Sequence, residues 1–136
     1  MITTLNPEEL HRTPGYHHVT IVDAGRLVFL AGQCPLDRSG AVPTELDAQV
    51  DQIVANSLIA LAAAGAAAEH VVRSVVYVAS TENSTLAAVW RRLTESALRP
   101  AFSTASTLLG VAALGFPGQL VELDLTAALP ATAVAE

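Results

Sequence analysis

The sequence lacks several residues that whole classes of proteins require. None of its 136 residues is a lysine, so all seven basic residues are arginines. A Schiff-base enzyme and a P-loop phosphate site both need a lysine, and the sequence therefore excludes both. Cys34 is the one cysteine, which excludes an intrachain disulfide and a cysteine-based zinc site. His17 and His18 would point to opposite faces of a strand, and His11 and His70 are scattered, so we expect no metal and no cofactor.

Basic surfaces and long apolar runs are also missing. The formal net charge is −6 and the single adjacent basic pair is Arg91-Arg92, so we expect no nucleic-acid partner. The longest uncharged stretches, 52–68 and 101–121, are broken by polar residues and glycine, so we expect no membrane span. The first ten residues lack the basic region and apolar core of a signal peptide, which favours a cytoplasmic protein.

Apolar residues make up 51% of the chain and fall into short periodic segments. We expect a single domain over 1–136, with a loosely ordered arm at 1–15 and tail at 130–136. Strand patterns cover 18–22, 26–31, 70–79 and two arms within 106–129. Turn residues predict two β-hairpins, one closed by Asp23-Ala24-Gly25 and one by Gly115–Gly118.

Two helices complete the expected order β-β-α-β-α-β-β. The first begins after Thr44, a plausible N-cap, and ends near Gly65. The second begins at Asn83 or Ser84 and ends before Pro100. This order predicts an α+β fold in which both helices cover one face of a single mixed sheet. The other face is rich in apolar residues, so we expect a second copy of the chain to cover it.

Two carboxylates fall on that uncovered face. In the last strand Val121, Leu123 and Leu125 alternate with Glu122 and Asp124. Glu122 is the candidate catalytic residue, because a half-buried carboxylate holds water and exchanges protons. The alternative is a carboxylate that is solvated or paired with an arginine of the next subunit. Asp124 is expected to be exposed or ion-paired, because two close carboxylates disfavour joint ionisation.

Four segments together resemble the Rid family, also called the YjgF or endoribonuclease L-PSP-like family. They are Ala31-Gly32-Gln33, Asn56 with the helix ending at 63–65, the strand at 75–78, and the strand at 120–124. The resemblance implies a chorismate mutase-like fold that assembles into a homotrimeric barrel with ligand clefts between subunits. It also implies a deaminase that hydrolyses an imine or enamine to a carbonyl compound and ammonia, with Glu122 positioning water.

The resemblance also implies the ligand-binding residues, and one of them is missing. An arginine that binds the substrate's carboxylate in this family is absent here. One alignment places Ser106 opposite it, and another places Phe102 there. The remaining expected ligand-binding positions are Tyr16, His18, Ala31, Gly32, Cys34 and Gly110. Arg26 and Arg99 are candidates for a replacement anchor.

Because a bidentate arginine is lost, a different small-molecule ligand is expected. The alternative function is a non-catalytic protein that binds or responds to a small metabolite. Ribonuclease activity is a third possibility, and the acidic charge argues against it.

Overall fold

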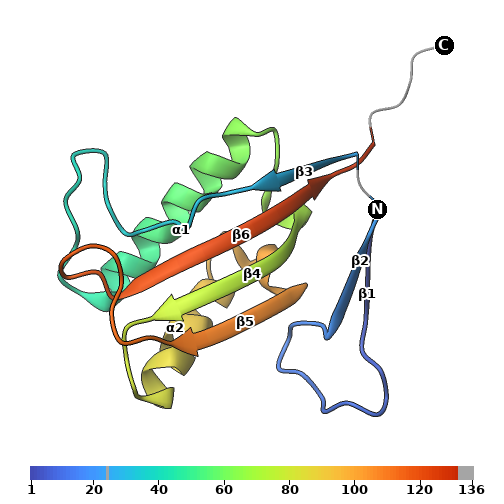
Figure 1. The fold of residues 1–136 in the computed structure, drawn as a ribbon, viewed down its shortest axis with the longest axis horizontal. Helices are drawn as coiled ribbons and strands as arrows, with labels where there is room; N and C mark the ends of the chain where they lie inside the picture. The colour runs from blue at the N-terminus through green and yellow to red at the C-terminus, as the bar shows by residue number, and fades with distance from the viewer. Residues whose placement is uncertain (24, 132–136) are drawn as a thin grey trace.

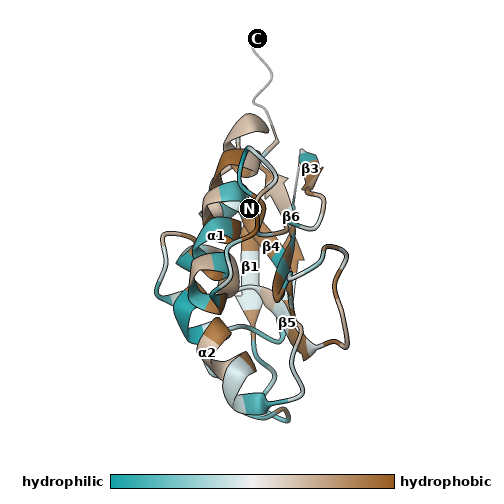
Figure 2. Ribbon diagram, turned by 90° about the vertical axis from the view of Figure 1, so that its left-hand side faces the viewer, coloured by the Kyte–Doolittle hydropathy of each residue, from teal (hydrophilic) through white to brown (hydrophobic). Residues whose placement is uncertain are grey.

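In the computed structural model, two helices cover one face of a mixed four-stranded sheet (Figure 1). The strands lie in the order β3 (Arg26–Phe29), β6 (Val121–Leu129), β4 (Val71–Val78) and β5 (Ala105–Gly110). β6 runs antiparallel to both β3 and β4, whereas β5 runs parallel to β4. Helices α1 (Leu46–Ala63) and α2 (Asn83–Thr94) lie on the same side of the sheet (Figure 2). This arrangement confirms the expected α+β class.

The structure describes residues 1–23 and 25–131. Ala24 of the expected turn and residues 132–136 of the expected tail lie outside the described residues. Short 3-10 helices at Ala68–His70 and Arg99–Phe102 precede β4 and β5. Among the described residues, neither long helix combines the length and apolar character that crossing a bilayer requires.

The N-terminal arm contains a strand that the sequence analysis missed. β1 (Ile2–Leu5) pairs antiparallel with β2 (Val19–Val22), and the two form a separate ribbon beside the main sheet (Figure 1). The expected hairpin between 18–22 and 26–31 is therefore wrong, because β2 pairs with β1 and β3 pairs with β6. The Gly25 N–H donates to the Leu129 carbonyl at 2.9 Å, so the chain joins β6 as soon as β2 has ended.

The expected hairpin over 106–129 is also wrong. β5 and β6 do not pair with each other, because each pairs with one edge of β4. The loop at 111–120 passes from one side of β4 to the other. Its ends are held by Val111 N–H to the Val78 carbonyl, 2.8 Å, and by Ala79 N–H to the Leu120 carbonyl, 2.9 Å. The glycines and proline there do make a turn, but a buried central strand offers two edges, and both arms pair with it.

The period of two in β6 separates the core from the uncovered face. Val121, Leu123 and Leu125 are fully buried against the helices, whereas Glu122 and Asp124 are half-buried on the opposite face. The helices contribute buried apolar side chains to this core, including Val50, Ile53 and Leu61 from α1 and Val89 and Leu93 from α2. This confirms the alternation read from the sequence.

The uncovered face carries apolar side chains that no helix covers. Register with Ala128 and Thr126 places Leu27 and Phe29 of β3 on this face, where they are 56% and 73% exposed. Val28 between them pairs with buried Ala127 and packs against the core. Large exposed apolar side chains gathered on a sheet face are typical of an interaction surface.

The ends of α1 depend on its neighbours more than on capping side chains. The N-cap is Glu45 rather than the expected Thr44, and no side chain caps it. Gly65 has a φ of +74° one residue beyond the C-cap, which suits the left-handed conformation that ends a helix. Fully buried Gln49 ties the first turn to two loops. Its amide donates to the carbonyls of Pro43 and Gly118 at 2.7 and 2.8 Å, and accepts from Leu120 N–H at 2.7 Å.

Replacing Gln49 by leucine should destabilise the fold by on the order of 3 kcal/mol, because three backbone groups lose their partner together. Urea unfolding followed by circular dichroism measures the change. Gln52→Leu is the matched control, since half-buried Gln52 donates one hydrogen bond, to Asn56 at 2.9 Å, and should cost about 1 kcal/mol or less. Equal losses in the two variants would contradict the role assigned to Gln49.

Candidate functional site

Glu122 lies on the uncovered face, beside the loop that follows β3. The loop is fixed to β6 by an antiparallel bridge, in which Gln33 N–H donates to the Leu123 carbonyl at 2.7 Å and Leu123 N–H donates back at 3.1 Å. Asn56 of α1 holds the same loop, because its amide donates to the carbonyls of Cys34 and Leu36 at 3.1 and 2.9 Å. The sheet and the helix therefore set the position of the loop against Glu122.

One oxygen of the Glu122 carboxylate accepts two hydrogen bonds. Cys34 Sγ donates to Oε1 at 3.2 Å, and Gln119 Nε2 donates to the same oxygen at 3.1 Å. The orientation of the Gln119 amide is itself fixed, because its oxygen accepts from Phe116 N–H at 3.1 Å. Its nitrogen also donates to the Val121 carbonyl at 3.1 Å. We call Gly32, Cys34, Gln119 and Glu122 the acid group.

The other oxygen, Oε2, lies against the backbone of Gly32. A Cβ atom at Gly32 would stand 2.3 Å from Oε2, so glycine allows the carboxylate to take this position. Among the described residues, no donor lies within hydrogen-bond range of Oε2. The acid group thus holds one oxygen of the carboxylate and leaves the other to bind water or a ligand.

The Cys34 thiol acts as a donor in this arrangement. Desolvation raises the pKa of Cys34 to about 11, and the hydrogen bond and negative charge of Glu122 add to the effect. The thiol therefore stays protonated at neutral pH, and its proton is directed at Glu122. Cys34, which is expected to contact a ligand, also contacts the candidate catalytic residue. A protonated thiol is a poor nucleophile, so the chemistry of the site does not come from sulfur.

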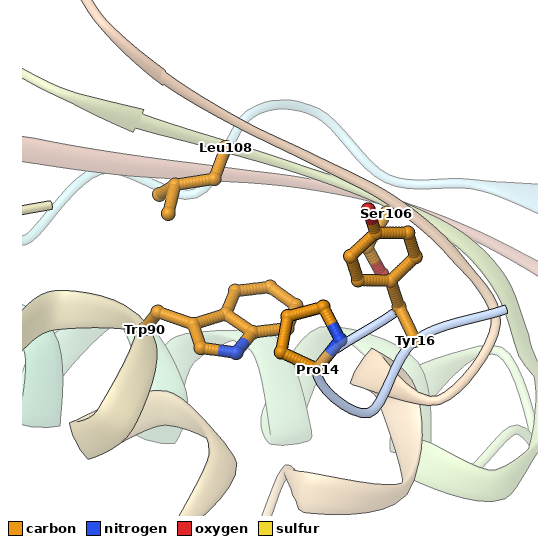
Figure 3. Close-up of a pocket in the computed structure, with 5 residues that line it drawn as sticks. All are labelled: Pro14, Tyr16, Trp90, Ser106 and Leu108. Carbon is orange, nitrogen blue, oxygen red and sulfur yellow. The ribbon is translucent and has the colours of Figure 1, made fainter. Parts of the chain in front are cut away.

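A second group of side chains forms a pocket of about 230 Å³ on the helix side of the sheet. It is lined by Pro14 and Tyr16 from the loop before β2, Trp90 of α2, and Ser106 and Leu108 of β5. Figure 3 shows Leu108 and Trp90 on opposite sides of the space, with Tyr16 and Pro14 at one end. The rings of Tyr16 and Trp90 meet edge-on, with centroids 6.4 Å apart. We call these five residues the aromatic pocket.

Ser106 is already hydrogen-bonded within the chain. Its hydroxyl accepts from Ser74 Oγ at 2.8 Å and donates to the Thr104 carbonyl at 3.1 Å. Ser74 is fully buried on β4. With its proton engaged, Ser106 offers the pocket a hydrogen-bond acceptor and no donor.

The acid group and the aromatic pocket face opposite sides of the sheet. Ser106 pairs with Ser74, which pairs with buried Leu125 on the helix side, whereas Glu122 pairs with Tyr77 on the uncovered side. β4 lies between the strands that carry them. The structure therefore brings Gly32 and Cys34 to Glu122, and Tyr16 to Ser106. It does not bring the two groups together within one chain.

Other expected positions lie outside both groups. His18 contacts Tyr16 edge-on, and its Nε2 donates a hydrogen bond to the His11 carbonyl at 2.8 Å, but it does not line the pocket. The Ala31 carbonyl accepts from the Gln33 side chain at 2.9 Å. The tight fit at Gly110 is within the chain, because a Cβ there would stand 2.3 Å from the Ser80 carbonyl oxygen. Gly110 is thus required by packing at the end of β5.

The charged residues that the sequence suggested as candidates also lie outside the acid group and the aromatic pocket. Arg26 pairs with Leu129, seven residues along β6 from Glu122, a distance of about 24 Å. Arg99 lines a hollow beside the aromatic pocket, with which it shares Pro14 and Trp90. Asp124 is half-buried and forms no ion pair with any described residue, so the expected exposure or pairing is not observed. Among the described residues, no three histidine, cysteine or acidic side chains are placed to hold a metal ion.

Four residues of these groups, Pro14, Trp90, Leu108 and Gln119, were not identified as site residues from the sequence. Gln119 lies in the loop before β6. A polar residue beside a turn and three positions before Glu122 is a signal for a local hydrogen bond to that carboxylate. The helical spacing of Trp90 indicates a core position. It does pack on Phe102, with centroids 5.5 Å apart, and it also lines the aromatic pocket.

The raised pKa of Cys34 predicts slow alkylation. At pH 8 iodoacetamide should modify the wild-type thiol slowly, and the rate should rise several-fold in Glu122→Ala, because removal of the carboxylate lowers the thiol pKa. Gly32→Ala should also raise the rate, since the added methyl group displaces the Glu122 side chain. Mass spectrometry against time gives the rates. Asp124→Ala is the control on the same face of β6, and an equal increase there would contradict the assignment.

The sequence was compared with known proteins and structures. The family model described as Endoribonuclease L-PSP matches residues 8–129. The Rid-family protein YyfB of Yersinia pestis is 31% identical over 94% of this chain and 98% of that one, with a TM-score of 0.83. A member of the YjgF/YER057c/UK114 family from Mycobacterium tuberculosis is 25% identical over 95% and 100%, with a TM-score of 0.64.

One further relative matches only part of this chain. Protein DfrA of Myxococcus xanthus is 38% identical over 64 residues, which are 46% of this chain and 49% of that protein. The aligned segment therefore spans about half of DfrA. The family match over 122 consecutive residues and the likeness to YyfB over nearly both chains agree with each other. This chain belongs to the endoribonuclease L-PSP family, which includes the Rid and YjgF proteins.

Proposed function

We propose that the chain forms a homotrimer with a small-molecule cleft between subunits and hydrolyses an imine or enamine there. The observation that carries the proposal is the acid group, in which Glu122 is held by one oxygen and leaves the other unbonded. An oriented carboxylate of this kind suits a general base that takes a proton from water as the water attacks a C=N carbon. The same carboxylate then returns the proton to the leaving nitrogen.

The separation of the two groups supports a site built from two subunits. Within one chain, the aromatic pocket faces the helix side and the acid group faces the other side. A single ligand meets both only where the acid group of one subunit lies against the aromatic pocket of another. The exposed Leu27 and Phe29 supply an apolar surface for that assembly.

The assembly predicts a particle of about 42 kDa, three times the chain mass of 14.1 kDa. Light scattering after size exclusion measures it. Phe29→Glu places a charge on the uncovered face and should dissociate the particle. The matched control is Ile59→Glu, because Ile59 is 69% exposed on α1 and belongs neither to the uncovered face nor to the aromatic pocket. A monomeric wild type would remove the cleft and the proposed function together.

The reaction itself is tested with imines generated by an oxidase in the same solution. One imine should come from an amino acid and one from an amine without a carboxylate. Hydrolysis of at least one should exceed the rate in buffer, as measured by ammonia release in competition with semicarbazide. Glu122→Gln should lower the enzymatic part by roughly 10²-fold or more, the usual size of a general-base effect, whereas Asp124→Asn should retain it. No acceleration, or full activity in Glu122→Gln, would refute the mechanism.

A non-catalytic binding protein is the second candidate. It is favoured by Ser106, which stands where one alignment places the carboxylate-binding arginine of the family. In that case ligands would bind and raise the melting temperature, and none of the imines would be hydrolysed faster than in buffer.

A further inference from the structure

The aromatic pocket has no positive group to receive a carboxylate. Its five lining residues are a proline, a tyrosine, a tryptophan, a serine and a leucine. The Ser106 hydroxyl, whose proton is used by the Thr104 carbonyl, presents an acceptor to the space. The Trp90 indole N–H and the Tyr16 hydroxyl can each donate one hydrogen bond, but no lining side chain carries a positive charge, so a ligand carboxylate would be desolvated without a charged partner, which is unfavourable. An N–H group of a ligand, in contrast, would find an acceptor there.

The acid group points to the same kind of ligand. Among the described residues, the ion pairs are those of Arg92 with Asp47 and Asp51, and Glu122 has no cationic partner. A ligand that meets Glu122 thus meets an uncompensated negative charge. Tyr16 and Trp90 also line the pocket, and aromatic rings attract positive charge over their faces. Both halves of the cleft disfavour an anion and favour a cation.

We propose that the ligand of this cleft has no carboxylate and binds as the cation of an apolar imine or enamine. This inference rests on the proposed function, because it assumes that the acid group and the aromatic pocket meet between subunits. The pocket volume of about 230 Å³ equals that of roughly eight water molecules in the liquid, which is room for one ring or a short aliphatic chain.

Hydrolysis of such a substrate needs water as its only co-reactant. An iminium ion R–CH=NH₂⁺ and one water give R–CHO and NH₄⁺. A C–O bond forms, the C–N bond breaks, and both protons of the water pass to the nitrogen. Glu122 carries the first proton as the water attacks and the second as the carbinolamine collapses to the aldehyde, with no change of oxidation state. The reaction that supplies this substrate is the oxidation of an apolar primary amine to its imine.

Arg99 is a cation that lies beside the pocket. It lines the adjoining hollow with Thr94, Phe102 and Ser103, behind the shared Pro14 and Trp90. If Arg99 moved to the pocket and bound a carboxylate, amino-acid ligands would be favoured. Arg99→Gln removes that possibility and leaves the pocket lining unchanged.

Binding is measured with two probes that differ only in a carboxylate, 2-phenylethylamine and L-phenylalanine. Trp90 is the single tryptophan of the chain and lines the pocket, so its fluorescence reports occupancy, and equilibrium dialysis gives an independent affinity. The wild type and Arg99→Gln should bind 2-phenylethylamine at least tenfold more tightly than phenylalanine. Equal binding, tighter binding of phenylalanine, or binding of neither probe would overturn the proposal.

Variants at Ser106 test the cause of the preference. Ser106→Arg adds a positive donor to the pocket and should favour phenylalanine over 2-phenylethylamine. Ser84→Arg is the matched control, because Ser84 is exposed at the start of α2 and the net charge changes equally. Ser106→Ala removes the acceptor, together with the hydrogen bonds to Ser74 and Thr104, and adds no positive charge, so it should weaken 2-phenylethylamine binding without improving phenylalanine binding. An unchanged preference in both Ser106 variants would contradict the role of this position.

Hydrolysis rates of the two imines distinguish a failure of the proposed ligand class from a failure of the proposed deaminase function. Faster hydrolysis of the imine of 2-phenylethylamine, but not of the 2-imino acid from phenylalanine, supports both. Faster hydrolysis of the 2-imino acid alone supports a deaminase and overturns the ligand class. A tenfold binding preference for 2-phenylethylamine without hydrolysis of either imine supports the ligand class and refutes the deaminase.

Discussion

The structure depends on β4 as a central strand with a partner on each edge. Its apolar side chains are buried beneath the helices, and its two edges are taken by β5 and β6. Once β6 lies between β4 and β3, its period of two assigns alternate residues to the core and to the uncovered face. The position of Glu122 follows from this pairing, because a shift of one residue would bury the carboxylate in the apolar core.

The sequence was sufficient for those features that depend on periodicity. The helices, the four strands of the main sheet and the two faces of β6 all follow from spacings of 3.6 and 2 residues. The sequence did not predict which strands pair. Turn residues at 23–25 and 115–118 indicate that the chain changes direction, but they do not determine with which strand the following segment pairs. Both predicted hairpins failed for this reason, and β1 was missed because a four-residue strand with two adjacent threonines at its centre carries little signal.

The site was predictable only in part, for a related reason. Glu122, Gly32 and Cys34 were identified, but the contact of Cys34 with Glu122 joins residues 88 positions apart, and no local pattern encodes it. Tyr16 and Ser106 were assigned to the same cleft as Glu122, whereas each chain presents them on the other side of its sheet. Residue lists from a family resemblance name the parts of a site without saying which subunit supplies each part.

Through the hydrogen bonds of Gln119, the loop at 111–120 becomes part of the acid group. The residue is at the end of the ten-residue connection between β5 and β6, and its amide is oriented by Phe116 within that connection. An insertion or deletion there would therefore alter the aim of the Glu122 carboxylate, even though the strand that carries it stayed unchanged. Surface loops usually tolerate variation in length, but in this protein loop length and acid geometry would have to evolve together.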